Sequence, residues 1–170
     1  MDKKLEKIVQ DLQERFGSSL EEFRGETHVF IKPEQIVEAL TLLRDKYEFE
    51  LLSALTAIDY WPQTSPRFHV VYQLSSLAKN VTLQLRVPVN GANPQVPTAT
   101  GVYKTANWRE REIMDMFGIE AVGHPDPRKI LLPDDQEGYP LRKDFPLGYE
   151  EVQFTFNIDD IDLRKPYAKE

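Results

Sequence analysis

Two neighbouring segments of alternating residues limit what this chain can fold into. From Arg67 to Ser76, and again from Asn80 to Pro88, apolar side chains occupy every second position. Alternation with a period of two is typical of a β-strand that buries one face. Phe49–Tyr60 is a further strand-like segment, and short connections join the three. We therefore predict that these three segments form an antiparallel meander.

Helices and one more strand are predicted around this meander. Gly17 supplies a left-handed C-terminal cap for the first helix, and Pro33 suits the first turn of the second. Thr98 or Thr100 is expected to cap the third. The helices are predicted over residues 5–16, 33–47 and 101–117, and the strand over residues 25–32. This order predicts a two-layer α+β domain over residues 1–118, with helices packed on a small, largely antiparallel sheet.

The periodic pattern ends at Gly118, and residues 119–170 are predicted to form an extended, irregular C-terminal tail. The 23 residues from His124 to Pro146 contain five of the chain's 12 prolines, five acidic side chains and four basic ones, with apolar residues between them. Such a segment cannot bury its apolar side chains against itself, yet it has too many of them for a solvated linker. We predict that it docks on another protein.

The composition excludes several classes of protein. The chain has no cysteine, so it can form no disulfide, thiolate zinc site or cysteine-ligated iron–sulfur cluster by itself. Its net charge of −7 argues against a general affinity for nucleic acid or anionic lipid. No apolar run approaches the roughly 20 residues that a membrane-spanning helix needs. The N-terminal residues lack the apolar core of a secretory signal, so we expect a cytoplasmic location.

One face of the predicted third helix gathers side chains that could carry chemistry. Its members, at spacings of three and four residues, are Trp108, Arg111, Glu112 and Asp115. Two carboxylates and a guanidinium can perform acid/base chemistry, but such clusters are more often ion-pair networks at a packed surface. Arg111 precedes Asp115, which is the less favourable order within an isolated helix. We therefore expect Arg111 to have its partner elsewhere.

The remaining residues give no complete catalytic, nucleotide-binding or metal-binding constellation. The three histidines, His28, His69 and His124, stand alone, without a second metal-ligating residue at the usual spacing. His124 begins the irregular segment, where we expect it to act as a hydrogen-bonding latch. The chain contains neither a glycine-rich phosphate loop nor a G-x-S-x-G elbow. No catalytic, cofactor-binding or metal-binding residue is predicted.

The third helix and the start of the tail together resemble a known family. The stretch WREREIMDMFGIEAVGHPDPRKIL, followed by PDD and GYPLRKDFPL, is similar to the signature of the 30-kilodalton-type subunit of respiratory complex I, NADH:quinone oxidoreductase. Gln136 stands where an aromatic residue is usual, so Tyr139 and Phe145 are expected to carry more of the docking. The positions of the signature are filled by Glu110, Arg111, Glu112, Asp115, Met116, Phe117, His124, Arg128, Ile130 and Leu131.

The resemblance implies a non-catalytic, structural subunit in the hydrophilic arm of a proton-pumping complex, peripheral at the cytoplasmic face of the cell membrane. It implies docking on the subunit related to the large hydrogenase chain, near the quinone-reducing end. NAD, FMN, iron–sulfur clusters and quinone then belong to the complex, with no cofactor on this chain. The predicted partner-binding residues are Trp108, Arg111, Glu112, Asp115, His124, Arg128, Tyr139, Arg142, Lys143 and Phe145.

Two other functions remain open at this point. Membrane-bound hydrogenases, and complexes fed by ferredoxin or a deazaflavin, use the same type of subunit, and the identity of the neighbouring subunits would separate them. A stand-alone acid/base enzyme would instead use Glu112, Asp115 and His124. Turnover by the purified single chain would establish that alternative.

Overall fold

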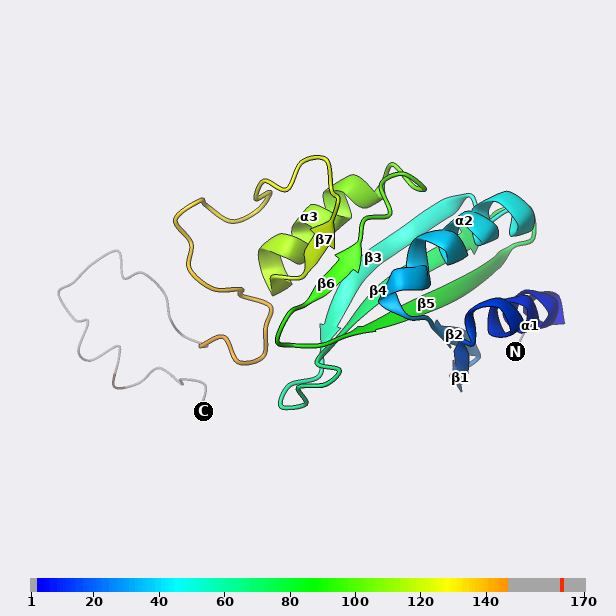
Figure 1. The fold of residues 1–170 in the computed structure, drawn as a ribbon, viewed down its shortest axis with the longest axis horizontal. Coiled ribbons are helices and arrows are strands. Elements are labelled where there is room, and N and C mark those ends of the chain that lie inside the picture. Colours follow the sequence, from blue (N-terminus) through cyan, green and yellow to red (C-terminus); the bar gives the residue numbers. More distant parts are fainter. Residues whose placement is uncertain (1–2, 147–162, 164–170) are drawn as a thin grey trace.

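The computed structural model describes residues 3–146 and Leu163 of the 170-residue chain. Within that part, three α-helices and seven strands follow one another in the order shown in Figure 1. The helices are α1 (Lys3–Phe16), α2 (Ile36–Tyr47), which the short 3-10 helix η1 (Pro33–Gln35) precedes, and α3 (Ala106–Phe117). The strands are β1 (Ser19–Phe23), β2 (Glu26–Phe30), β3 (Leu51–Asp59), β4 (Phe68–Ser76), β5 (Val81–Val89), β6 (Gln95–Pro97) and β7 (Glu120–Val122).

The predicted meander forms the three strands β5, β4 and β3 on one side of a five-stranded sheet with the order β1-β2-β5-β4-β3. Strand β4 pairs antiparallel with β3 on one side and with β5 on the other. Tyr72 lies at the middle of this meander, opposite Leu55 on β3 and Leu85 on β5, and all three side chains are buried. Alternation along these strands therefore directs one set of side chains into the core, as the sequence predicts.

Strand β2 changes the sheet from antiparallel to mixed, because it pairs parallel with β5. The other three pairings in this sheet are antiparallel, so the predicted largely antiparallel sheet is confirmed. Apolar residues of all three helices join one core cluster with one face of the sheet; examples are Leu12 of α1, Leu40 of α2 and Ile113 of α3. The molecule is thus a two-layer α+β fold, which confirms the predicted fold class.

Three short strands and the start of α3 differ from the predictions. All five residues of β1 are exposed, so no buried-face alternation marks this strand in the sequence. Strands β6 and β7 have three residues each and pair parallel across an intervening helix, which no local pattern can reveal. Helix α3 begins at Ala106 rather than near residue 101. Neither predicted threonine caps it, because the residue before the helix is Thr105 and Thr98 bonds elsewhere.

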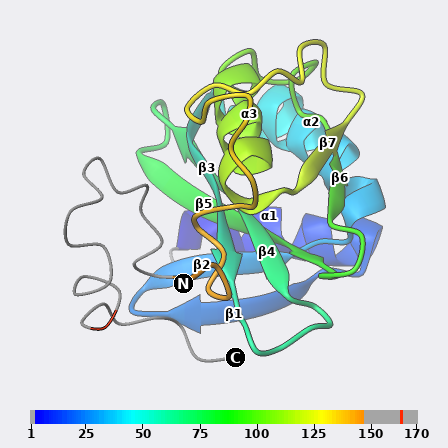
Figure 2. The ribbon, with the colours of Figure 1, turned by 90° about the vertical axis from the view of Figure 1, so that its left-hand side faces the viewer.

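Strand β7 lies beyond the predicted domain boundary at residue 118. It pairs with β6, and Figure 2 shows both strands beside α3. Ile119 and Ala121 are buried, so the chain continues to pack with the body for several residues after α3. The division into domains at residue 118 stays a prediction, but the irregular part of the described chain begins after Val122.

The central strand gives a direct test of the core. Replacing Leu85, which is fully buried on β5, with alanine should lower the free energy of unfolding by about 2–5 kcal/mol because it leaves a cavity between sheet and helices. Urea denaturation measures this change. Leu77→Ala is the matched control, since Leu77 is 70% exposed and should cost less than about 0.5 kcal/mol. Equal losses in the two variants would contradict this assignment of the core.

Candidate functional site

The segment from His124 to Pro146, here called the tail segment, lies along α3 of its own chain. It leaves β7, passes over the helix and returns towards the end of the sheet (Figures 1 and 2). Backbone groups of the segment form hydrogen bonds with side chains of α3 at several points. The irregular segment is therefore organised by the helix that precedes it.

Asp115 makes the densest of these contacts. Its Oδ2 atom accepts hydrogen bonds from the backbone N–H groups of Ile130, Leu131 and Leu132, at 3.1, 2.8 and 2.9 Å. The side chain is almost fully buried, with 4% of the residue exposed. A buried carboxylate that accepts several backbone N–H groups forms charge-assisted hydrogen bonds, which are roughly twice as strong as neutral ones. Asp115 thus fixes three successive residues that have no regular structure.

Arg111, one turn before Asp115, binds the same stretch through its carbonyl groups. Its Nε donates to the carbonyl oxygen of Arg128 at 2.9 Å, and an Nη donates to that of Lys129 at 3.0 Å. The other Nη lies 3.6 Å from Asp126. The planar guanidinium presents its donors in a rigid fork, which suits two consecutive carbonyl oxygens. We call Arg111 and Asp115 together the α3 clip.

The electrostatics of the clip favour the charged form of Asp115. Burial by itself raises the pKa of this carboxyl group, but the backbone N–H groups of Leu132, Leu131 and Ile130, together with the charge of Lys129, bring the pKa below its ordinary value. The carboxylate therefore stays ionised at neutral pH and holds the tail segment as an anion.

His124 fastens the start of the tail segment to the N-terminal end of α3, and Glu110 ties the same helix to the loop before it. The Nδ1 atom of His124 accepts the Asp126 N–H at 3.0 Å, so its Nε2 carries the proton and donates to the Asn107 carbonyl oxygen at 3.1 Å. This agrees with the predicted latch. Glu110 accepts from the N–H of Ala99 at 2.6 Å, and burial raises its pKa. Both buried side chains tie the helix to neighbouring loops rather than to solvent.

The C-terminal end of α3 is capped by the far part of the tail segment. The Arg142 side chain donates to the carbonyl oxygen of Phe117 at 2.6 Å, and its guanidinium lies 4.4 Å from the centre of the Tyr139 ring. Gly118 ends the helix with a φ of +66°, and a Cβ atom there would clash with the Tyr139 ring. The tail segment thus supplies donors to helix carbonyl groups that have no partner within the helix.

A second ion-pair cluster, here called the Arg67 lock, holds the end of the tail segment against the sheet. Arg67 donates to both carboxylate oxygens of Asp59, at 3.0 and 2.9 Å, and also pairs with Asp144 of the tail segment. The N–H of Lys143 donates to Asp59 as well, at 2.9 Å. Burial raises the pKa of Asp59, but Arg67 and the N–H groups of Lys143 and Trp61 bring the pKa below its ordinary value. The lock is therefore charged at neutral pH.

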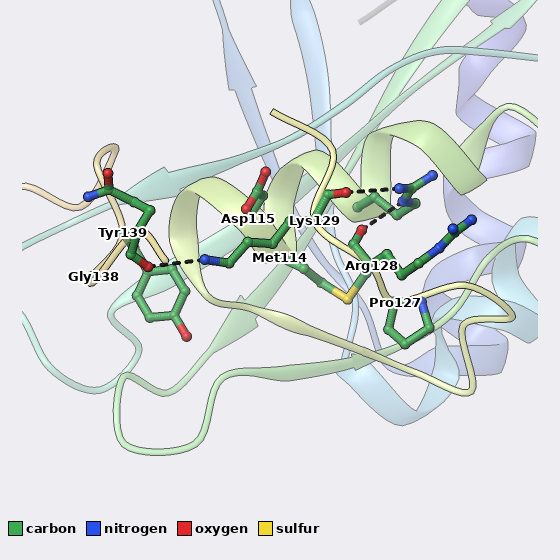
Figure 3. Close-up of a pocket in the computed structure, with 9 residues that line it drawn as sticks. Met114, Asp115, Pro127, Arg128, Lys129, Gly138 and Tyr139 are labelled. Atoms are coloured by element: carbon green, nitrogen blue, oxygen red, sulfur yellow. Dashed lines mark hydrogen bonds between the residues drawn. The ribbon is translucent and has the colours of Figure 1, made fainter. Parts of the chain in front are cut away.

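A cavity of about 230 Å³ remains between α3 and the tail segment. Figure 3 shows Met114 and Asp115 on its helix side, facing Arg128, Lys129 and Tyr139 of the tail segment. The Lys129 ammonium group does not point to a substrate-sized space, because it donates to three carbonyl oxygens of the turn that follows. Of the basic side chains around this cavity, Arg111 and Lys129 therefore bind backbone carbonyl groups, whereas Arg128 pairs with the Asp126 carboxylate.

The helix face that the sequence predicts as one unit is divided in two by the tail segment. Arg111 and Asp115 are buried beneath it, whereas Trp108 and Glu112 remain exposed. The expectation that Arg111 has its partner outside the helix is confirmed, and that partner belongs to the same chain. Whether the α3 clip also touches another protein stays a prediction.

The other predicted partner-binding residues fall into two groups. The side chains of Arg128 and Lys143 are exposed, and Arg128 pairs with the neighbouring Asp126. Tyr139 and Arg142 pack against the end of α3, while the Phe145 ring lies against Gly138 within the tail segment. A partner-binding role for these residues stays a prediction, and the first group presents its charge to solvent.

The structure does not assemble the three residues of the acid/base hypothesis. Asp115 lines the cavity beneath the tail segment, whereas Glu112 lines a different groove. The His124 ring is committed to Asn107 and Asp126. Among residues 3–146 and Leu163, no group of three His, Asp or Glu side chains lies close enough together to hold a metal ion.

Sequence reasoning missed the Arg67 lock, although a signal for it exists. Asp59 ends one strand of the meander and Arg67 precedes the next, so an antiparallel pairing brings the opposite charges together. The ion pair between Asp144 and Arg67 depends on the path of the tail segment, so no local pattern in the sequence predicts it. Glu110 is a position of the family signature for which the sequence predicts no role. In the structure its carboxylate accepts a hydrogen bond from the Ala99 N–H and so joins α3 to the loop before it.

Comparison with known proteins identifies the family. Residues 29–151 match the family described as respiratory-chain NADH dehydrogenase, 30 Kd subunit. The chain belongs to this family. It is 50% identical over 151 residues to the corresponding NADH-quinone oxidoreductase subunit of Roseiflexus sp. (strain RS-1), a match that covers 88% of this chain and 86% of that protein. With the corresponding subunit of Salinispora tropica (strain CNB-440) it shares 42% identity over 158 residues, or 89% of this chain and 64% of that protein.

Solved structures of related chains agree with this family. The trypsin-resistant fragment (1-134) of Nqo5 is similar with a TM-score of 0.66 and 32% identity, over 72% of this chain and 98% of that one. A chain of the membrane-bound sulfane sulfur reductase, an archaeal respiratory membrane complex, has a TM-score of 0.73 at 23% identity, over 85% and 87% of the two chains. The second similarity shows a shared fold. The resemblance found in the sequence is confirmed.

The α3 clip should protect the backbone amides that it binds. In Asp115→Asn the uncharged amide accepts hydrogen bonds more weakly, so exchange at the amides of Ile130, Leu131 and Leu132 should become about 10- to 100-fold faster. Hydrogen exchange followed by NMR measures this. Glu112→Gln, the same chemical change on an exposed residue of the same helix, should leave those rates unchanged. Equal exchange rates in wild type and Asp115→Asn would disprove the clip.

The Arg67 lock should make part of the stability depend on pH. The pKa values of Asp59 and Asp144 are lowered from 3.8, so their contribution is present above that pH and is lost as the pH falls through the folded-state values. The difference in unfolding free energy between wild type and Asp59→Asn should be about 3 kcal/mol near pH 7 and should shrink below about pH 4.

Chemical denaturation at a series of pH values measures this difference. Asp135→Asn is the control, because Asp135 is exposed and should give a difference near zero throughout. A difference for Asp59→Asn that stays constant down to about pH 2 would contradict the charged lock.

Proposed function

We propose that this chain is a structural, non-catalytic subunit of a respiratory NADH:quinone oxidoreductase. The observation that carries the proposal is the 50% identity to a known NADH-quinone oxidoreductase subunit along 88% of the chain, together with the family match over residues 29–151. Under this proposal the complex is the enzyme, and this chain contributes shape and an interface to it.

The organisation of the tail segment supports an interface role. The α3 clip and the Arg67 lock hold an irregular segment in one conformation within the chain itself. A surface that is ordered before binding loses less conformational entropy when a partner docks. The outward side of the segment presents Leu131 and Leu141 together with the charges of Arg128 and Lys143. Apolar anchors within a charged rim are typical of protein interfaces.

The proposed partner is the subunit related to the large hydrogenase chain, near the quinone-reducing end of the hydrophilic arm. The proposed location is peripheral, at the cytoplasmic face of the membrane. None of the helices in the described part of the chain is both long and apolar enough to span a bilayer. We further propose that NAD, FMN, iron–sulfur clusters and quinone bind other subunits of the complex.

A second candidate is the equivalent subunit of another membrane-bound redox complex. The TM-score of 0.73 to a chain of an archaeal sulfane sulfur reductase supports this candidate, because it shows that a subunit of a different redox complex has the same fold. A membrane-bound hydrogenase, or a complex fed by ferredoxin or a deazaflavin, belongs to the same class of alternatives. The higher identity to subunits of NADH-quinone oxidoreductase favours the first proposal.

Purification of the native assembly tests the proposal. An affinity-tagged copy of the full chain, produced in its own host, should co-purify with a flavin-containing, NADH-oxidising subunit and with the large-hydrogenase-like subunit. Deletion of the chain should abolish NADH:quinone reductase activity of the membranes, and the wild-type chain should restore it. The purified single chain should not oxidise NADH.

The identity of the co-purified chains separates the candidates. A large partner that carries nickel ligands, without an NADH-oxidising subunit, would favour the hydrogenase alternative. A tagged chain that purifies alone would contradict both, and turnover by that single chain would support an independent enzyme.

A further inference from the structure

A groove of about 580 Å³ runs beside the exposed side of α3, where strand β3, the helix and the tail segment meet. Each element contributes a large apolar side chain that solvent reaches: Leu51 of β3 is 40% exposed, Trp108 of α3 is 62% exposed, and Leu131 of the tail segment is 60% exposed. Scattered single apolar residues are ordinary on a protein surface, but three around one hollow form a patch. We call it the Trp108 groove.

The walls of the Trp108 groove are held by contacts within the chain. The N–H of Leu131 is bound to Asp115 at 2.8 Å, so the α3 clip fixes the wall from the tail segment. The buried Arg111 guanidinium lies 5.6 Å from the centre of the Trp108 ring. On the opposite wall, Arg109 donates to the carbonyl oxygen of Ser53 at 3.1 Å and joins α3 to β3. The groove is therefore formed before any partner arrives.

One charged side chain at the groove remains without a partner. Glu112 is exposed and, among the described residues, has neither a hydrogen bond nor an ion pair. Arg109, the other charged side chain that lines the groove, is bound to the backbone of β3. Glu112 is therefore the charged group at the groove that a partner can pair with, and a cation is its complement.

We propose that the Trp108 groove receives a segment of the neighbouring large subunit that carries an apolar side chain beside an arginine or lysine. The apolar side chain enters between Trp108 and Leu131, and the cation pairs with Glu112. Tryptophan is among the residues that most often dominate binding energy at interfaces. This inference rests on the proposed function, because it names the surface through which the subunit docks.

The charge of the chain disfavours a second copy as the occupant. The net charge is −7, so two copies repel each other. The described part of the tail segment is already committed to the clip and the lock. A partner with a locally basic surface can pair with Glu112 and is not repelled by the negative charge of this chain.

Binding of full-length variants to the complex prepared without this subunit tests the groove. Trp108→Ala and Leu131→Ala should each weaken binding at least about tenfold. Glu112→Gln should weaken it a few-fold at low salt and less at high salt, and Glu112→Arg should weaken it more. Leu77→Ala is the matched control, because Leu77 is 70% exposed in the β4–β5 connection and should bind like wild type.

Hydrogen exchange separates loss of the groove from loss of the clip. Unchanged protection of the Leu131 amide in Trp108→Ala would show that the clip is intact, and the Glu112 variants do not touch the clip at all. Wild-type binding by the Trp108, Leu131 and Glu112 variants would overturn the groove while leaving the proposed function in place. Self-association of wild type that Trp108→Ala abolishes would overturn it in favour of a second copy. If the wild-type chain itself does not bind the complex, the proposed function fails first.

Discussion

The bond between the Asp115 carboxylate and three successive backbone N–H groups is the contact on which the C-terminal part of the described structure depends. Residues 130–132 make no strand or helix, so their amides would otherwise compete for water or remain unpaired. One buried, ionised oxygen binds all three. Arg111 binds the carbonyl groups just before them, so the two side chains together supply hydrogen bonds that this irregular stretch does not make within itself.

Helix α3 consequently serves two surfaces at once. Its Arg111 and Asp115 side chains face the tail segment of the same chain, whereas Trp108 and Glu112 remain open to solvent. Much of the family signature in this chain therefore describes how the tail segment is held. In our proposal the partner touches the surface that this arrangement creates, because Leu131 reaches the Trp108 groove only when the clip fixes its backbone.

Local patterns predict much of the body because its elements each have one buried face. Alternation along β4 and β5, and helical spacing in α1 and α2, follow directly from that requirement. Strand β1 gives no such pattern because all its residues are exposed, and β6 and β7 give none because three residues are too few to show a period. The predicted start of α3 is wrong because Thr98, a possible cap by its position, instead donates to Glu110 within the fold.

The sequence by itself determined the fold class and the family, since these follow from periodicity and from residue order. The tertiary structure decided the partner of each charge. Arg111 and Asp115 stand four residues apart and could pair with each other, yet burial beside unpaired backbone groups gives each a separate partner. A buried charged side chain forms hydrogen bonds with buried backbone groups that have no other partner. Only the folded chain brings those backbone groups close to the charge.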